Sequence, residues 1–204
     1  MNSESMTARV PTLAGMLLPR SGKIETTLLA IGGSLLLAVS AKIQVPSWPV
    51  PMTLQSLAVL LIGIGFGSRL GVATILVYLA EGLFGLPVFA GPLAGPAYFA
   101  GPTAGYLLGF LLSAATVGAL AERGWDRNLL GAGIVLVAGH VLIFIPGVLW
   151  LAVLFGPAKA VAVGVLPFIT GSIVKTALGI AIVALMWQLA DKKRQASMRD
   201  RETR

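Results

Sequence analysis

The chain has 204 residues, of which 56% are hydrophobic and 11% are charged, and its mean hydropathy is +0.89. This balance excludes an ordinary soluble domain and indicates an integral membrane protein. The net charge of +7 does not indicate nucleic-acid binding, because six of the fifteen basic residues lie between Asp191 and Arg204, where they are typical of a cytoplasmic anchor beside anionic lipid.

Charge, proline and glycine divide the chain into three regions. We expect a flexible cytoplasmic arm at 1–23, a membrane domain at 24–190 and a basic cytoplasmic tail at 191–204. The membrane domain contains six apolar segments, of which the second and third are shorter than the ~20 residues that a spanning helix needs. We expect Pro146 to kink or split the fifth segment. The segments are Ile24–Ile43, Thr53–Phe66, Leu70–Phe84, Thr103–Ala121, Leu129–Leu154 and Pro167–Leu189.

The basic residues predict the orientation, because short cytoplasmic loops retain positive charge. One side has Lys42 and Lys159 only, and the other side has the remaining basic residues of the loops and both ends of the chain. The predicted fold is therefore an all-α membrane protein: a bundle of six transmembrane helices with a Gly/Pro-rich extracytoplasmic loop and both termini cytoplasmic. That loop, Gly85–Gly105, has no charged residue but too many glycines and prolines for a long helix. We expect it to form a lid or pocket wall, since irregular backbone at membrane depth is covered by protein or lines a cavity.

Lys175 is the strongest candidate for a functional residue. It lies eight residues beyond Pro167, roughly 12 Å into the membrane at 1.5 Å per residue. A lysine near the centre of a spanning helix costs roughly 2.5–3.5 kcal/mol, so it requires a partner or a cavity. The structural interpretation is an ion pair with Glu81; the functional one is a fixed cation for an anionic ligand.

Polar side chains expected at the same outer depth are further candidates for ligand contacts. Tyr residues there could instead belong to an interfacial aromatic belt. His140 is expected to be a packed histidine, and one histidine without clustered carboxylates predicts no metal site. The chain has no cysteine and no phosphate-binding loop, so neither a thiolate metal site nor ATP hydrolysis is predicted. The polar candidates are Thr53, Gln55, Tyr98, Thr103 and Tyr106.

Several stretches resemble the BioY family, the biotin-binding S components of energy-coupling-factor (ECF) vitamin transporters. They are "VPMTLQSLAVLLIG", "YLAEGLFGLPVFAG", "GPTAGYLLGF" and the Lys175 segment, and the likeness runs in order from about Ile24 to Leu189. The resemblance implies a multi-pass protein of the bacterial cytoplasmic membrane that captures biotin from the outer side. It implies a transmembrane coupling protein and ATPase subunits as partners, no enzymatic activity, and no cofactor besides the ligand biotin.

The resemblance also implies residue roles. Lys175 would neutralise the biotin carboxylate, and Leu86, Val88 and Phe89 would form an apolar wall. Glycines of the loop, Gly91 among them, would let the backbone approach the ligand. Small residues spaced by four on the first helix would dock the coupling protein; they are Ala30, Ser34 and Ala38.

One departure concerns Ser172, which stands where the family pattern Gly-Asp-x-x-Lys has an acid. A serine accepts hydrogen bonds more weakly than a carboxylate. Either Gln55 or Glu81 supplies the acceptor, or the affinity is lower, or the ligand is a relative of biotin. The alternatives are therefore an S component for another small anionic vitamin and a solitary biotin transporter. A non-transporting scaffold, with a permanent Lys175–Glu81 ion pair, and an intramembrane enzyme subunit are disfavoured.

Overall fold

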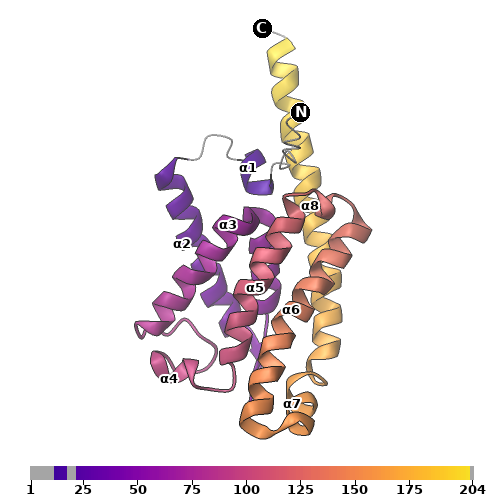
Figure 1. Ribbon diagram of the computed structural model, residues 1–204. Helices are drawn as coiled ribbons and strands as arrows, with labels where there is room; N and C mark the ends of the chain where they lie inside the picture. Colours follow the sequence, from indigo (N-terminus) through magenta and orange to yellow (C-terminus); the bar gives the residue numbers. More distant parts are fainter. Residues whose placement is uncertain (1–11, 18–21, 203–204) are drawn as a thin grey trace, which may run out of the picture.

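The computed structural model describes residues 12–17 and 22–202, which form a bundle of long helices with two short strands at one end (Figure 1). Most of the predicted N-terminal arm, 1–11 and 18–21, lies outside the described residues. In chain order the elements are α1 (Leu13–Leu17), α2 (Lys23–Lys42), β1 (Gln44–Val45), β2 (Met52–Thr53), α3 (Gln55–Leu83), α4 (Pro96–Phe99), α5 (Ala104–Ala121), the 3₁₀ turn η1 (Trp125–Arg127), α6 (Leu129–Phe155), α7 (Pro157–Gly164) and α8 (Phe168–Glu202).

Five of these helices are long and apolar enough to cross a membrane: α2, α3, α5, α6 and the part of α8 from Phe168 to Lys193. Their outward faces carry large apolar side chains, for example Leu28, Leu149 and Val153. Such faces are stable against lipid and would be costly against water. The prediction of a helical multi-pass membrane protein is confirmed.

Helix α3 consists of two halves, 55–66 and 68–83, that meet at Gly67 with φ 81° and ψ 178°. A Cβ added to Gly71 would lie 3.3 Å from Gly63 Cα, whereas eight residues of straight helix rise about 12 Å. The second half therefore folds back against the first. The predicted break between the second and third apolar segments falls at this sharp turn.

Glu122 stabilises the turn. The backbone N–H and the hydroxyl of Ser68 each donate to Glu122 Oε1 at 2.8 Å. A carboxylate at this place satisfies orphan donors at the start of the second half of α3.

The central helices approach one another closely because glycines face backbone. The first half of α3 packs on α5, and α5 packs on α6. A Cβ on Gly63 would lie 3.2 Å from the Ala114 carbonyl oxygen, and one on Gly109 would lie 2.6 Å from that of Ile143. The strips of small residues on these helices therefore serve packing within the chain.

Two expectations about the chain's course require correction. Pro146 does not split α6, which runs without interruption from Leu129 to Phe155; Tyr106 packs on Gly147 at this point and supports the helix. Residues 13–17, expected to belong to a loose arm, form the helix α1, because Leu13 is fully buried against the bundle. The basic tail continues α8 as one helix as far as Glu202.

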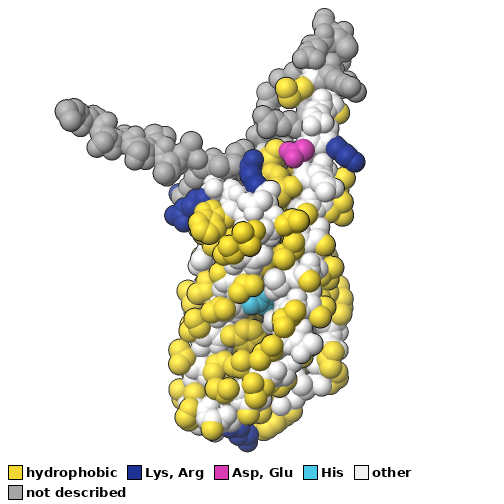
Figure 2. Space-filling model, turned by 90° about the vertical axis from the view of Figure 1, so that its right-hand side faces the viewer, with side chains coloured by type: hydrophobic (Ala, Val, Ile, Leu, Met, Phe, Trp, Pro, Cys, Tyr) yellow, Lys and Arg dark blue, Asp and Glu magenta, His cyan; other side chains and the backbone are white. Residues whose placement is uncertain are grey.

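The basic residues gather at the end of the bundle where α8 projects (Figure 2). This end includes Lys23, Arg123 and Arg127, and it is the end at which Figure 1 places α1 and the last turns of α8. Lys159 lies on α7 at the opposite end. The charge asymmetry read from the sequence is thus also an asymmetry in space.

Candidate functional site

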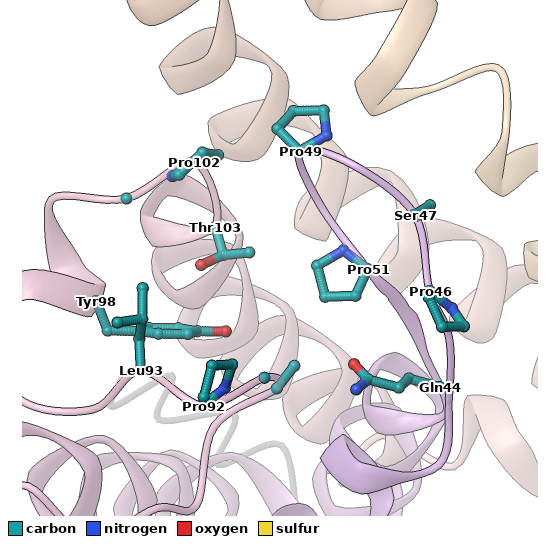
Figure 3. A pocket seen from close by; sticks show the side chains of 13 residues that line it. Gln44, Pro46, Ser47, Pro49, Pro51, Pro92, Leu93, Tyr98, Pro102 and Thr103 are labelled. Carbon is teal, nitrogen blue, oxygen red and sulfur yellow. The ribbon is translucent and has the colours of Figure 1, made fainter.

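A cavity of about 250 Å³ (Figure 3) opens at the end of the bundle where α4 lies, opposite α1 and the last turns of α8 (Figure 1). Two irregular segments form it, one at 44–51 after α2 and one at 90–103 around α4. The predicted pocket wall, Gly85–Gly105, thus contributes one side, and the other side comes from the proline-rich stretch before α3. The lining residues are Gln44, Pro46, Ser47, Pro49, Pro51, Ala90, Gly91, Pro92, Leu93, Tyr98, Gly101, Pro102 and Thr103.

Polar groups from both segments converge on a mostly apolar wall. The side chains of Gln44, Tyr98 and Thr103 point into the cavity (Figure 3). Burial raises the pKa of the Tyr98 phenol, and hydrogen bonding with Thr103 acts in the opposite direction. Tyr98 is therefore a neutral hydrogen-bonding group. An apolar cavity with a few placed polar groups is typical of a small-molecule site.

Phe89 fastens the wall segment to the bundle. It is fully buried, stacks on Tyr98 at 4.3 Å between ring centroids, and meets Tyr78 edge-on at 5.3 Å. The Tyr78 hydroxyl donates to the Val88 carbonyl at 3.1 Å. Gly82 makes room for the ring, since a Cβ there would lie 2.0 Å from Phe89 Cζ. Phe89, expected as part of a ligand wall, instead supports Tyr98 from behind.

Further contacts tie both segments to the helices. Lys42 Nζ donates to the Phe89 carbonyl at 2.7 Å, and Trp150 Nε1 donates to the Gly101 carbonyl at 2.9 Å. On the other side, Lys159 Nζ lies 5.4 Å from the centre of the Trp48 ring. These contacts preorganise the cavity walls, which lowers the ordering cost of ligand binding.

Lys175 lies deeper, where α8 meets the first half of α3. Its Nζ donates to Ser56 Oγ at 2.9 Å. In the described part of the chain it forms no ion pair with a carboxylate. The ammonium group is thus held by a neutral hydroxyl among apolar helices, and its charge is not neutralised by the protein.

Two residues beside this contact have buried side chains: Gln55, next to Ser56 in the sequence and close to Tyr78, and His140, next to Thr176. Gln55, beside Ser56, is buried, and its Nε2 has no hydrogen-bond partner among the described residues. Thr176 Oγ1 lies 3.3 Å from His140 Nδ1, which also lies 3.1 Å from the Leu136 carbonyl oxygen. The expected packed histidine is therefore found, in contact with the residue next to Lys175.

The start of α3 connects the cavity with this deeper cluster. Pro51 lines the cavity and Ser56 contacts Lys175. Between them, Met52 covers α8, because a Cβ on Gly171 would lie 2.7 Å from Met52 Sδ. Ser172 follows Gly171 and is half-buried. Figure 3 shows the cavity itself, and α3 links it along the chain to the Ser56–Lys175 contact.

The ion pair that a scaffold function required does not form. Glu81 accepts a hydrogen bond from Ser34 Oγ on α2, whereas Lys175 contacts Ser56. Glu81 is thus engaged with α2 and Lys175 with the start of α3, and the two charges have separate partners. Because Glu81 is bonded to Ser34 on α2, it does not act as a hydrogen-bond acceptor beside Ser172 in this conformation.

Other predicted ligand residues have partners within the chain. Tyr106 donates its hydroxyl to the Gly164 carbonyl at 2.9 Å, and Thr53 Oγ1 accepts from the Gln55 backbone N–H at 3.3 Å. Leu86 is 52% exposed on the outside, and Val88 is half-buried behind the cavity wall. The described residues contain no cluster of His, Cys, Asp or Glu that could hold a metal ion.

The predicted docking stripe on α2 faces inward. Ala30 and Ser34 are buried and Ala38 packs against the core, because α2 turns its small residues toward the second half of α3. In this conformation the stripe packs within the chain. Large apolar side chains, such as Leu28 and Leu35, occupy the exposed face of α2.

Three residues of the candidate site were not predicted from the sequence: Gln44, Ser47 and Ser56. Gln44 and Ser47 belong to "QVPSWPVP", which repeats the mixture of proline and apolar residues seen in the predicted pocket wall. This shared composition is the feature of the sequence that could have predicted a second pocket wall. Ser56 has no such signal, since only packing brings it to Lys175.

Fold and site define the class: a multi-pass membrane protein with a cavity suited to a small molecule at one end and, on α8, a half-buried lysine that forms no ion pair with a carboxylate of the described residues. A model of the BioY family matches residues 9–192. The chain is 40% identical over 158 residues to the "probable biotin transporter BioY" of Pyrococcus horikoshii, covering 78% of this chain and 93% of that protein. It is 37% identical over 155 residues to the "biotin transporter BioY" of Thermotoga maritima, covering 74% and 88%.

A solved structure extends the comparison to the fold. The crystal structure of the S-component for biotin from an ECF-type ABC transporter matches with a TM-score of 0.71 and 26% identity, over 81% of this chain and 92% of that chain. The chain belongs to the BioY family. The resemblance inferred from the sequence is confirmed, and the matched relatives are transporters, not enzymes.

Proposed function

We propose that this protein is the S component of an ECF-type biotin transporter and binds biotin between the cavity of Figure 3 and Lys175. The observation that carries the proposal is the Lys175 ammonium group, which lies among apolar helices with the Ser56 hydroxyl as its partner. A half-buried cation inside a membrane protein is costly, and an incoming carboxylate would offset that cost.

The chemistry of biotin matches the two parts of the site. Its carboxylate would pair with Lys175, and its apolar ring and chain would lie against the proline-rich walls. Its ureido group needs donors and acceptors, which we propose that Tyr98 and Thr103 in the cavity wall and Gln55 at the start of α3 supply. Ser172, a neutral residue, would contribute a weaker contact than an acid.

The topology that we propose has six membrane crossings, with the halves of α3 counted separately. Support comes from the hairpin at Gly67 and from the basic residues at the end where α1 lies and α8 projects. Positive charge at that end favours a cytoplasmic location. The cavity then opens on the outer side of the bacterial cytoplasmic membrane, where biotin is captured.

We also propose a coupling protein and ATPase subunits as partners, by analogy with the solved ECF-type S component. Because Ala30 and Ser34 are buried, docking through the small-residue stripe would require α2 to move from α3. A solitary transporter is the alternative. Purification with the native membrane complement separates the two, since co-purified ATPase subunits support the first.

Calorimetry with two ligands tests the site. The ligands are biotin and its primary amide, which has no negative charge, and the variants are Lys175→Ala and the control Lys192→Ala, in the exposed part of α8. We expect Lys175→Ala to weaken biotin binding about 10- to 100-fold, the value of a charge-assisted hydrogen bond. The variant should bind the amide as the unaltered protein does.

The two ligands separate the site from the function. Equal losses for biotin and its amide would refute the pairing of Lys175 with the carboxylate, although biotin would remain the ligand. Failure of the unaltered protein to bind biotin would refute the function itself and favour another small anionic vitamin.

A further inference from the structure

A second cavity lies at the opposite end of the bundle, between η1, the start of α6 and α8. It has a volume of about 220 Å³, below the about 300–1,000 Å³ of pockets that enclose drug-sized ligands. Its wall combines the carboxylates of Asp126 and Asp191 with Arg127, and with apolar side chains that include Leu129 and Ile180. The biotin site does not use any of these residues.

Asp126 is the unusual member of this cavity. Its side chain is only 2% exposed, and Oδ2 accepts a hydrogen bond from Trp187 Nε1 at 2.8 Å. Oδ1 is buried and has no hydrogen-bond partner within the described residues. A buried carboxylate oxygen without a donor is costly. The cavity beside it can admit a group that donates hydrogen bonds and carries positive charge.

The surroundings indicate the depth of a lipid headgroup. Trp187 lies under the Arg127 guanidinium, with 4.5 Å between Cζ and the ring centre, and indole rings favour the membrane interface. Leu129 and Leu130 are 64% and 76% exposed. In a multi-pass membrane protein, these side chains face the acyl chains of the lipids.

The combination of charges selects the headgroup. A divalent cation is disfavoured, because the described residues hold no cluster of three or more acidic or histidine ligands. An anionic group alone would be repelled by the Asp126 and Asp191 carboxylates. A phosphorylated primary amine fits both signs of charge, with its ammonium toward the carboxylates and its phosphate toward the Arg127 side of the cavity.

We propose that this cavity binds the headgroup of an aminophospholipid, with the ammonium of phosphatidylethanolamine donating to Asp126 Oδ1. Asp191 adds negative charge at the same cavity, and Leu129 and Ile180 lie along the acyl chains. The site does not depend on biotin binding. In the proposed topology it belongs to the cytoplasmic leaflet, where a bound lipid would brace η1 against α8.

Lipid retention measures this selectivity. The full chain is reconstituted with equal amounts of phosphatidylethanolamine and phosphatidylcholine that share the same acyl chains, and the lipids that remain after mild detergent purification are quantified by mass spectrometry. Phosphatidylcholine is the control lipid, because its trimethylated nitrogen keeps the positive charge but cannot donate a hydrogen bond. We expect about tenfold enrichment of phosphatidylethanolamine, the ratio that corresponds to one charge-assisted hydrogen bond.

Carboxylate-to-amide variants locate the site. Asp126→Asn should abolish the enrichment and Asp191→Asn should reduce it, whereas Glu25→Gln, a change at an exposed carboxylate on α2, should leave it intact. Asp191 lies on an exposed part of α8, so Asp191→Asn keeps the test valid if Asp126→Asn does not fold. Equal enrichment in the unaltered protein and in both aspartate variants would refute the site.

Two further outcomes would overturn the lipid assignment. Absence of any preference in the unaltered protein would refute the lipid and fit instead a lysine of a partner protein. Free phosphoethanolamine tests the soluble source: if it raises the melting temperature of the delipidated protein as much as the phospholipid does, the occupant is a soluble phosphorylated amine.

Discussion

Gly82→Ala tests whether the packing of Phe89 builds the ligand cavity. The added Cβ would lie 2.0, 2.2 and 2.6 Å from three atoms of the Phe89 ring, so the ring must move. Phe89 stacks on Tyr98, whose side chain points into the cavity (Figure 3). The substitution should therefore lower both the stability and the affinity for biotin.

The magnitude follows from two opposing effects. Overpacking of a core costs about 1–3 kcal/mol, and replacing glycine by alanine inside a helix stabilises by roughly 0.5–1 kcal/mol. Gly65→Ala is the matched control, because it lies in the same helix and a Cβ there would meet no atom within 4 Å. We expect Gly82→Ala to be less stable than Gly65→Ala by about 2–3 kcal/mol, near the upper end of the overpacking range because the contact is so short.

Reversible denaturant unfolding in mixed micelles, with calorimetry for biotin, measures both effects. A second background isolates the clash: in Phe89→Ala the ring is absent, so adding Gly82→Ala should cost nothing further. Equal stability of Gly82→Ala and Gly65→Ala, or an unchanged cost in the Phe89→Ala background, would refute the argument that the ring requires this glycine.

Two tyrosines and one carboxylate give the remaining predictions. Tyr106→Phe should lose about 1 kcal/mol of stability, because the Tyr106 hydroxyl donates to the Gly164 carbonyl. Tyr98→Phe should instead mainly weaken biotin binding. Thermal unfolding measures the first effect and calorimetry the second, and the reverse pattern would contradict the assignment. Burial raises the pKa of Asp126 above its ordinary value of 3.8. At pH values between 3.8 and the raised pKa, the folded state therefore binds more protons than the unfolded state. Stability should therefore fall as pH rises through that window, and unfolding at a series of pH values should show a weaker dependence in Asp126→Asn; equal slopes would contradict the prediction.

The sequence offers candidate site residues only where a residue's local environment suggests a role. Lys175 is such a candidate, because an ammonium group deep in an apolar helix is costly wherever its neighbours lie. Gln55 is a candidate for a similar reason, and both remain predictions. Phe89 and Tyr106 were predicted as ligand contacts; the Phe89 ring packs on Gly82 and Tyr98, which lie nearby in the sequence, whereas the Tyr106 hydroxyl donates to the Gly164 carbonyl of a distant segment.

The sequence by itself determined the membrane class, the apolar segments, the charge asymmetry and the irregular wall at Gly85–Gly105. These follow from composition and from the conformational limits of glycine and proline, which act locally. Only the tertiary structure decided that α3 folds back at Gly67, that Ser34 and not Lys175 contacts Glu81, and that Ser56 is the partner of Lys175. Such pairings depend on how helices distant in sequence rotate and pack, and that is set by shape complementarity across the whole bundle.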